Sequence, residues 1–308
     1  MEKHQQKAYF QSYLTRPELF LCILFFLLFA VKTVYPQQAN DMYDRARVYT
    51  EKAPGDSVHL KIDNGFVIPI SLQLDLFSHN LEGAGDSVIF DIVPAADSAR
   101  VIGRFKIRNP DSVYLCTYKW KVVLGDTSKT PDLAYSYRYP YQSWVPYKVS
   151  QGPGGAFSHK NMFAYDFALP IGTPVTAARE GLVALVKDDS RVGGNNKALT
   201  RDANFIAIMH PDGTIANYIH LRAAALVKEG QWVHKGQIIG YSGNTGYTTG
   251  PHLHFEIIQP LLSAEVKQSV AFKWEPAVYA YLPVYGNYFL NSLFGKRQGK
   301  YRNMITES

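Results

Sequence analysis

The sequence predicts a mostly β protein in which an N-terminal β-sandwich-like domain is followed by a compact antiparallel β domain. Composition is the first reason, because aromatic residues make up 14% of the chain and β-branched runs are common. Patterning is the second, because short segments alternate between apolar and polar residues and are separated by Gly, Asp, Asn and Pro. Length is the third, because 308 residues are enough for two domains with cores of their own.

Period-two alternation is clearest in the first of these domains, which we place at residues 41–146. The apolar stripes follow every second residue of the segments 57–62, 68–76, 87–93, 101–107, 114–124 and 135–141. About six short strands with turn residues between them are typical of a β-sandwich. We find no chemistry in this domain, since its histidines, His59 and His79, stand alone.

The second domain is placed at 147–262, after a linker rich in Pro, Gly and aromatic residues. Its segment GLVALVK (181–187) is expected to form a strand, and residues 204–221 a hairpin that turns at Pro211-Asp212-Gly213. The aromatic segment from 263 to 308 is treated as a C-terminal tail. All of these elements are short strands, as an antiparallel β domain requires.

The N-terminal segment, residues 1–40, is predicted to be a signal peptide or a membrane anchor. Leu19 to Val31 is an unbroken apolar run, with Lys3, Lys7 and Arg16 before it. The run suits the apolar core of an export signal, and a retained anchor that attaches the protein to the membrane is the alternative. Both place the bulk of the chain in the periplasm or another extracytoplasmic space. The net charge of +6 is spread along the chain, so no nucleic-acid partner is expected.

Candidate functional residues gather in the second domain. His252 and His254 lie two positions apart in GPHLHFEI, so on a strand both side chains point to the same face. His159, Asp166 and His220 lie on other short motifs of this domain. A catalytic zinc typically has three protein ligands and a water, with imidazole and carboxylate as suitable donors. His159, Asp166 and one of the paired histidines meet that count, which leaves two histidines to handle protons.

Three motifs together resemble the LytM-type zinc metalloendopeptidases, also called lysostaphin-like or M23 peptidases. They are SHKNMFAYDFALPIGTPVTAAREGLV, NYIHL and SGNTGYTTGPHLHFEI, and the resemblance covers about 147–260. It implies one zinc ion per chain, held by His159, Asp166 and His254, with His220 and His252 as catalytic histidines that are not ligands. It also implies an M23-type peptidase fold for this domain and, as substrate, the cross-linked peptide stems of peptidoglycan.

Roles follow from this assignment. His252, as the strand neighbour of His254, is expected to take a proton from the attacking water, and His220 to stabilise the oxyanion or assist the leaving amine. The division between these two histidines stays open. Tyr218, Thr245 and Tyr247 are expected to contact substrate.

The spacing between His159 and Asp166 departs from the commonest family pattern. Six residues, Lys160 to Tyr165, separate His159 from Asp166, where the commonest form of the family has three. A longer loop can still close on a metal at little extra entropic cost.

His210 and His234 lie outside the three motifs. Both lie next to turn residues, and we expect both to be exposed to solvent.

Two other functions are compatible with the sequence. One is a catalytically inactive LytM-fold protein that regulates or activates other cell-wall hydrolases. Such proteins typically lack one or more ligands, whereas this chain has all five site residues. The other is a lipoyl- or biotinyl-like binding module, because residues 229–243 share its strand-and-turn pattern. Neither Lys228 nor Lys235 is flanked by Met or Ala, as a modified lysine would be.

Overall fold

The computed structural model describes residues 44–84, 87–142, 147–262, 268–276, 284–285 and 288–289. The segment predicted as a leader lies outside these residues, as does most of the predicted tail. Strands dominate the described residues, joined by turns and a short 3-10 helix, η3 (Lys197–Asp202). The prediction of a mostly β protein is therefore confirmed. Within these ranges, no helix has the length and apolar character needed to cross a membrane.

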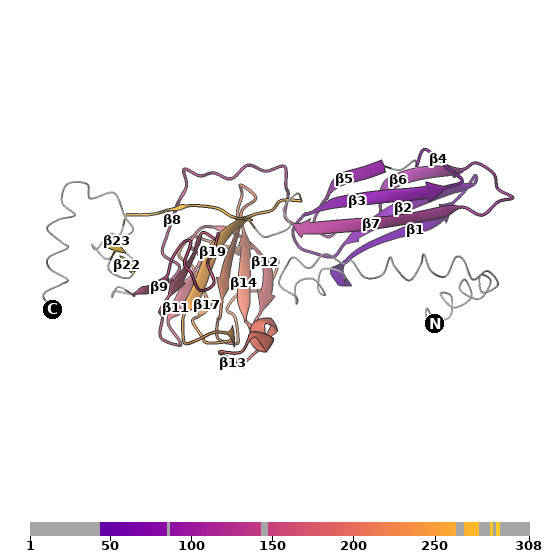
Figure 1. Ribbon diagram of the computed structural model, residues 1–308. Coiled ribbons are helices and arrows are strands. Elements are labelled where there is room, and N and C mark those ends of the chain that lie inside the picture. The colour runs from indigo at the N-terminus through magenta and orange to yellow at the C-terminus, as the bar shows by residue number, and fades with distance from the viewer. Residues whose placement is uncertain are drawn as a thin grey trace, which may run out of the picture. The chain divides into compact units, whose positions relative to one another are not determined.

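Two antiparallel sheets form the N-terminal part (Figure 1). In order, the strands of the first are β1 (Ala46–Ala53), β2 (Ser57–Asn64), β6 (Arg100–Ile107) and β4 (Leu81–Glu82). Those of the second are β5 (Ser87–Val93), β3 (Ile70–His79) and β7 (Leu115–Leu124). Their inward side chains, such as Leu60 and Leu74, are fully buried in one hydrophobic cluster. Each such leucine contributes about 2 kcal/mol of burial free energy.

Alternation in the sequence locates most of these strands to within a few residues. The predicted segments 57–62, 101–107 and 114–124 correspond to β2, β6 and β7. Strand β1 was not predicted, because only Ala46 and Val48 of its apolar stripe face the core before the pattern ends.

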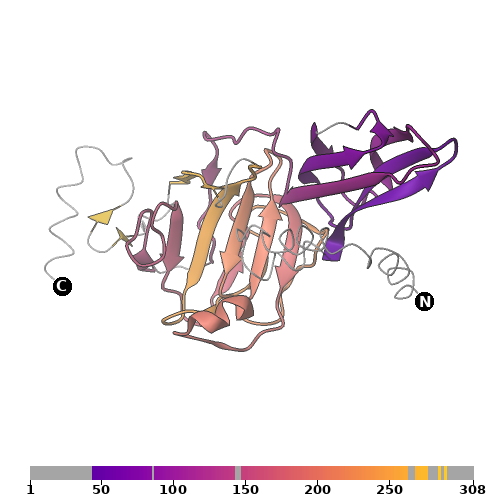
Figure 2. The same cartoon turned by 45° about the vertical axis from the view of Figure 1, so that its right-hand side comes forward.

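A large sheet dominates the rest of the described chain, and its strands lie side by side in Figure 2. Its central order is β12 (Gly181–Lys187), β14 (Phe205–Met209), β15 (Ile215–Ile219), β19 (Leu253–Gln259), β10 (Ala164–Phe167) and β9 (Val149–Gln151). Strands β14 and β15 form the predicted hairpin, with Gly213 at a positive φ of 83° in its turn. Neighbouring strands are antiparallel, as expected for this domain.

The two faces of this sheet differ in chemistry. On β19, Leu253 and Phe255 point to a hydrophobic cluster, whereas the alternate residues His254 and Glu256 point to the opposite, polar face. The apolar face contains the side chains of Tyr218 and Phe167, each fully buried. The hydrophobic cluster therefore supports a sheet whose other face is free to carry polar residues.

The tyrosine stripe at 135–141 differs from its prediction as a strand of the N-terminal domain. Only β8 (Ser136–Tyr137) is regular, and it pairs in parallel with β21 (Lys273–Trp274). The Tyr139 ring stacks on Trp274 at 5.0 Å, and the Tyr141 ring contacts Phe167 at 5.3 Å. These aromatic contacts place the stripe against the apolar face of the large sheet.

Candidate metal centre and catalytic histidines

Cross-strand pairing brings the first two candidate ligands together. In the antiparallel pair β10–β19, Asp166 lies directly opposite His254. Residues that face each other in this way project from the same side of a sheet. The Oδ1 atom of Asp166 lies 3.0 Å from Nδ1 of His254. Two residues that are distant in sequence thus meet on the polar face of the sheet.

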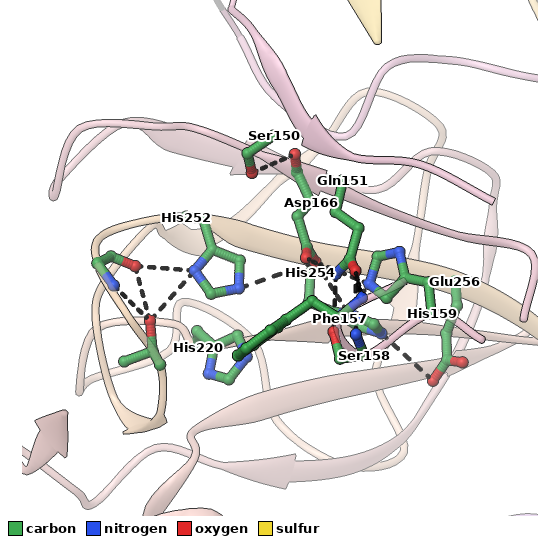
Figure 3. A network of polar contacts seen from close by, with 12 residues as sticks. Ser150, Gln151, Phe157, Ser158, His159, Asp166, His220, His252, His254 and Glu256 are labelled. Carbon is green, nitrogen blue, oxygen red and sulfur yellow. Dashed lines mark hydrogen bonds and ion pairs between the residues drawn. The ribbon is translucent and has the colours of Figure 1, made fainter. Parts of the chain in front are cut away.

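His159 reaches the same point from the loop that precedes β10. Its Nε2 lies 3.2 Å from Nδ1 of His254 and 3.2 Å from Oδ1 of Asp166. Its Nδ1 lies 3.1 Å from the carbonyl oxygen of Gly152, which accepts a hydrogen bond from that nitrogen. The proton on Nδ1 leaves Nε2 bare and directed at the other two groups (Figure 3). The His159 ring is fully buried.

These three atoms fit a zinc ion. Their mutual separations are 3.0–3.2 Å. Donors at about 2.0–2.2 Å from a tetrahedral zinc lie about 3.3–3.6 Å from one another, so small shifts of side chains would admit the ion. Two imidazole nitrogens and one carboxylate oxygen are also the donor types that zinc prefers. The hydrogen bond from His159 to Gly152 is the kind of outer contact that orients a ligand.

The charge state of Asp166 suits a cation. Burial favours the neutral acid, but the close contacts with His159 and His254 outweigh burial and hold the pKa of Asp166 below its ordinary value. The carboxyl group is therefore ionised at neutral pH.

His252 lies beside this cluster and is oriented by its own turn. Its Nδ1 donates to the carbonyl oxygen of Gly250 at 2.8 Å, which leaves Nε2 bare. That Nε2 lies 3.8 Å from Oδ1 of Asp166 (Figure 3). Burial lowers the pKa of His252, against the attraction of the Asp166 carboxylate. A neutral ring with a bare nitrogen toward the cluster is the form that a general base needs.

His220 completes the group from the end of β15. Its ring centre lies 4.5 Å from that of His252, and its Nδ1 donates to the carbonyl oxygen of Thr245 at 2.7 Å. Its φ of 68° is in the left-handed region, which costs a residue with a Cβ atom about 1–2 kcal/mol. Burial, with a smaller effect of His252, lowers the pKa of His220 to about 3. The ring is neutral, and the strained backbone directs it toward His252.

The three residues predicted to contact substrate differ from one another in burial. Tyr218 is fully buried in the hydrophobic cluster, and its hydroxyl accepts a hydrogen bond from the Ala178 N–H at 2.8 Å. The expected contact of Tyr218 with substrate is therefore wrong in this structure, because its ring lies on the apolar face of the sheet. Thr245 is buried too, and its carbonyl group holds His220. Tyr247 is partly exposed on β18 (Gly246–Tyr247), and its contact stays a prediction.

His210 also differs from its expectation of solvent exposure. It is 2% exposed, and its Nδ1 donates to the carbonyl oxygen of Glu180 at 2.8 Å. The Tyr137 ring covers it at 5.6 Å. The turn pattern correctly predicted the backbone but not the aromatic residue that packs on it. His234 is exposed, as predicted.

Two polar residues at the site were missed from the sequence. Gln151 donates to Oδ2 of Asp166 at 2.9 Å, and no motif marks this glutamine. Glu256 is fully buried next to His254, and its Oε1 accepts a hydrogen bond from the Asn217 side chain at 3.1 Å. Glu256 continues the alternation of His252 and His254, so the sequence could have predicted that its side chain lies on the same face of the sheet as theirs.

Comparisons with known proteins agree on one family for this part of the chain. The family model "Peptidase family M23" matches residues 160–268. The peptidoglycan DD-endopeptidase ShyA of Vibrio cholerae is 44% identical over 93 residues, which are 30% of this chain and 19% of ShyA. Lysostaphin of Staphylococcus simulans is 40% identical over 95 residues, 30% of this chain and 17% of lysostaphin. The chain thus spans about a fifth of the length of these curated relatives.

The structure of lysostaphin from Staphylococcus simulans has a TM-score of 0.33 at 33% sequence identity, and covers 42% of this chain and 51% of that one. From the family match and the relatives in sequence, residues 160–268 form a peptidase domain of family M23.

Proposed function

We propose that this protein is a zinc-dependent endopeptidase that hydrolyses the peptide cross-links of peptidoglycan. The observation that carries the proposal is the geometry of His159, Asp166 and His254, whose donor atoms lie 3.0–3.2 Å apart with two further histidines beside them. The name of ShyA supports the substrate class, because it is a peptidoglycan DD-endopeptidase with 44% identity to this domain. We place the reaction outside the cytoplasmic membrane, where peptidoglycan lies.

In this proposal His159, Asp166 and His254 hold the zinc ion. When bound, zinc polarises the scissile carbonyl and lowers the pKa of a water toward about 7. The remaining chemistry belongs to the histidines. His252 takes the proton of the attacking water on Nε2, since its Nδ1 proton is already donated to Gly250.

His220 has the same tautomer, with its Nδ1 proton on the Thr245 carbonyl oxygen. Its bare Nε2 therefore accepts a proton before it can donate one. We assign it to proton transfer toward the leaving amine: the proton that the attacking water gives up is passed on through His220 to the amine nitrogen as the C–N bond breaks. The ring distance of 4.5 Å to His252 allows the two histidines to act on neighbouring atoms of one substrate.

Incubation of the purified full chain with cross-linked muropeptides tests the proposal. We expect cleaved cross-links, loss of cleavage with a chelator, and recovery when zinc is restored. The His252→Ala variant should bind zinc but lose at least 100-fold in kcat/KM, because it lacks the general base. A matched His234→Ala variant, at an exposed histidine, should keep full activity. Cleavage that persists in the chelated protein would reject a zinc mechanism.

A further inference from the structure

We propose that Gln151 is a positioning residue for the metal centre. Its side-chain amide restricts Asp166 to one coordinating oxygen and ties the loop that carries His159 to strand β9. This inference rests on the proposed function only in that the three ligands hold a metal. It does not depend on which peptide bond is cut.

Gln151 makes four hydrogen bonds through one amide group (Figure 3). Its Nε2 donates to Oδ2 of Asp166 at 2.9 Å and to Oγ of Ser158 at 2.7 Å. Its Oε1 accepts from the backbone N–H groups of Phe157 and Ser158 at 3.1 and 3.0 Å. A primary amide has two N–H donors and two acceptor lone pairs, so its capacity is used completely. Rotation by 180° would set an oxygen against the carboxylate, so the orientation is fixed.

The first consequence concerns the coordination of Asp166. Its Oδ1 lies 3.0 Å from Nδ1 of His254 and 3.2 Å from Nε2 of His159. Its Oδ2 is held by the Gln151 amide instead. An oxygen that accepts this hydrogen bond in a buried site is directed away from the position a shared cation would take. Asp166 should therefore bind with one oxygen and leave a position open for water and substrate.

The second consequence concerns the loop 152–159. Six residues separate His159 from Asp166, so the backbone of β10 alone does not determine where His159 lies. Gln151 faces Asp166 across the β9–β10 pair and bonds to the residues immediately before His159. It thus joins both ligand-bearing segments at their closest approach.

Packing supports the same role. Gln151 is 8% exposed, and the loop crosses its side chain at Gly155. A Cβ atom added at Gly155 would lie 2.4 Å from Cγ of Gln151. Alanine at 155 would therefore displace the glutamine side chain without removing any polar group. This gives a second, independent way to disturb the amide.

The experiment uses the full-length protein with zinc and with cobalt(II) as probes. Gln151→Leu keeps most of the side-chain volume and removes all four hydrogen bonds. Gly155→Ala is the second variant, and it decides the question if Gln151→Leu does not fold. Gln237→Leu is the matched control, because Gln237 also accepts a backbone N–H, that of His234 at 3.0 Å, in a turn of its own. Zinc affinity is measured by competition with a chromogenic chelator, and coordination by the visible absorption of cobalt(II).

We expect zinc affinity to fall 10–100-fold in Gln151→Leu and less in Gly155→Ala, as for other partners of metal ligands. Cobalt absorption should weaken as Asp166 gains a second coordinating oxygen, because four-coordinate cobalt(II) absorbs more strongly than five-coordinate. Gln237→Leu should match the wild type in both measurements. Wild-type affinity and spectrum in a folded Gln151→Leu variant would overturn the inference. A wild type that binds metal but cleaves nothing would reject the proposed function alone, whereas one that binds no metal would overturn both.

Discussion

His220 shows how a single residue can combine a backbone cost with a functional position. Its φ of 68° is unusual for a residue with a Cβ atom, and such strain is kept where the surrounding structure enforces it. Here the Nδ1 hydrogen bond to the Thr245 carbonyl oxygen and the pairing of the next residue, Leu221, with Ser242 hold the residue in place. The strain is therefore tied to the direction of the imidazole.

This strain predicts an unusual order of stability for two variants. Glycine normally destabilises a folded chain relative to alanine, but at a positive φ it avoids the cost of the Cβ atom. We expect His220→Gly to be more stable than His220→Ala by about 1 kcal/mol in urea unfolding. Both should lose most activity, because neither has the ring. If the alanine variant proved the more stable, the left-handed backbone at this position would be wrong.

Among single residues, the sequence predicted which candidate site residues lie together better than it predicted the residues that surround them. The five predicted site residues match a motif in type and order, and the fold brings them together, while their roles stay predictions. Gln151 could not be identified in this way, since a glutamine has no distinctive chemistry and its contacts depend on the loop that closes over it. The burial of His210 was missed for a related reason, because Tyr137 comes from a distant segment.

At the scale of elements, a closely spaced pair of short strands lies next to the residue that holds His220. Strand β13 (Gly193–Gly194) pairs in parallel with β18, next to the Thr245 carbonyl group that holds His220. A Cβ atom at Gly193 would lie 1.7 Å from the backbone oxygen of Asn244, so the strands can approach only because this residue is glycine. At Gly194 the nearest atom to an added Cβ, on Leu199, is 3.8 Å away, which is ordinary contact.

Alanine should therefore reduce activity at one of these neighbouring positions and leave it nearly unchanged at the other. Gly193→Ala must push β13 from β18, and we expect at least a tenfold loss of kcat/KM as Thr245 and His220 shift. Gly194→Ala should retain activity within about twofold. Steady-state kinetics on muropeptides, with circular dichroism to verify folding, compares the two. Equal activity in both variants would mean that the pairing of β13 with β18 does not support the site.

The tyrosine stripe at 135–141 shows what alternation in the sequence cannot predict. Alternation of apolar residues indicates that one side of a segment is buried, but it does not identify the surface that buries it. Tyr137 and Tyr139 face partners near the other end of the chain, Phe272 and Trp274. The hairpin β14–β15 was predicted correctly, because both of its strands and its turn are local in sequence.

For the whole molecule, a bound metal should act as a stabilising ligand. His159, Asp166 and His254 come from separate segments, so zinc would bind the folded chain far more tightly than the unfolded one. Saturation at 100 times the Kd adds about 2.7 kcal/mol to the free energy of unfolding. Zinc should therefore raise the melting temperature in scanning calorimetry and a chelator should reverse the change. The Asp166→Ala variant should show no such shift, and a shift of wild-type size would place the metal elsewhere.

A second property of the whole molecule is its loss of stability in acid, to which buried His210 should contribute. Burial lowers the pKa of His210 to about 4, whereas an unfolded histidine titrates near 6.5. Between these values the unfolded chain binds the additional proton, so stability rises with pH through this window and is complete above about 6.5. As pH falls from 7 to 5, this one residue should remove about 2 kcal/mol from the free energy of unfolding.

Urea unfolding at both pH values, in the presence of chelator, isolates this contribution when variants are compared. The difference between pH 7 and pH 5 should be about 2 kcal/mol smaller in His210→Gln than in the wild type, because glutamine does not titrate. The His234→Gln variant, at an exposed histidine, should keep the wild-type difference. Other buried histidines, such as His220, titrate in all three proteins and cancel in the comparison. An unchanged difference in His210→Gln would mean that His210 is protonated as easily in the folded chain as in the unfolded one.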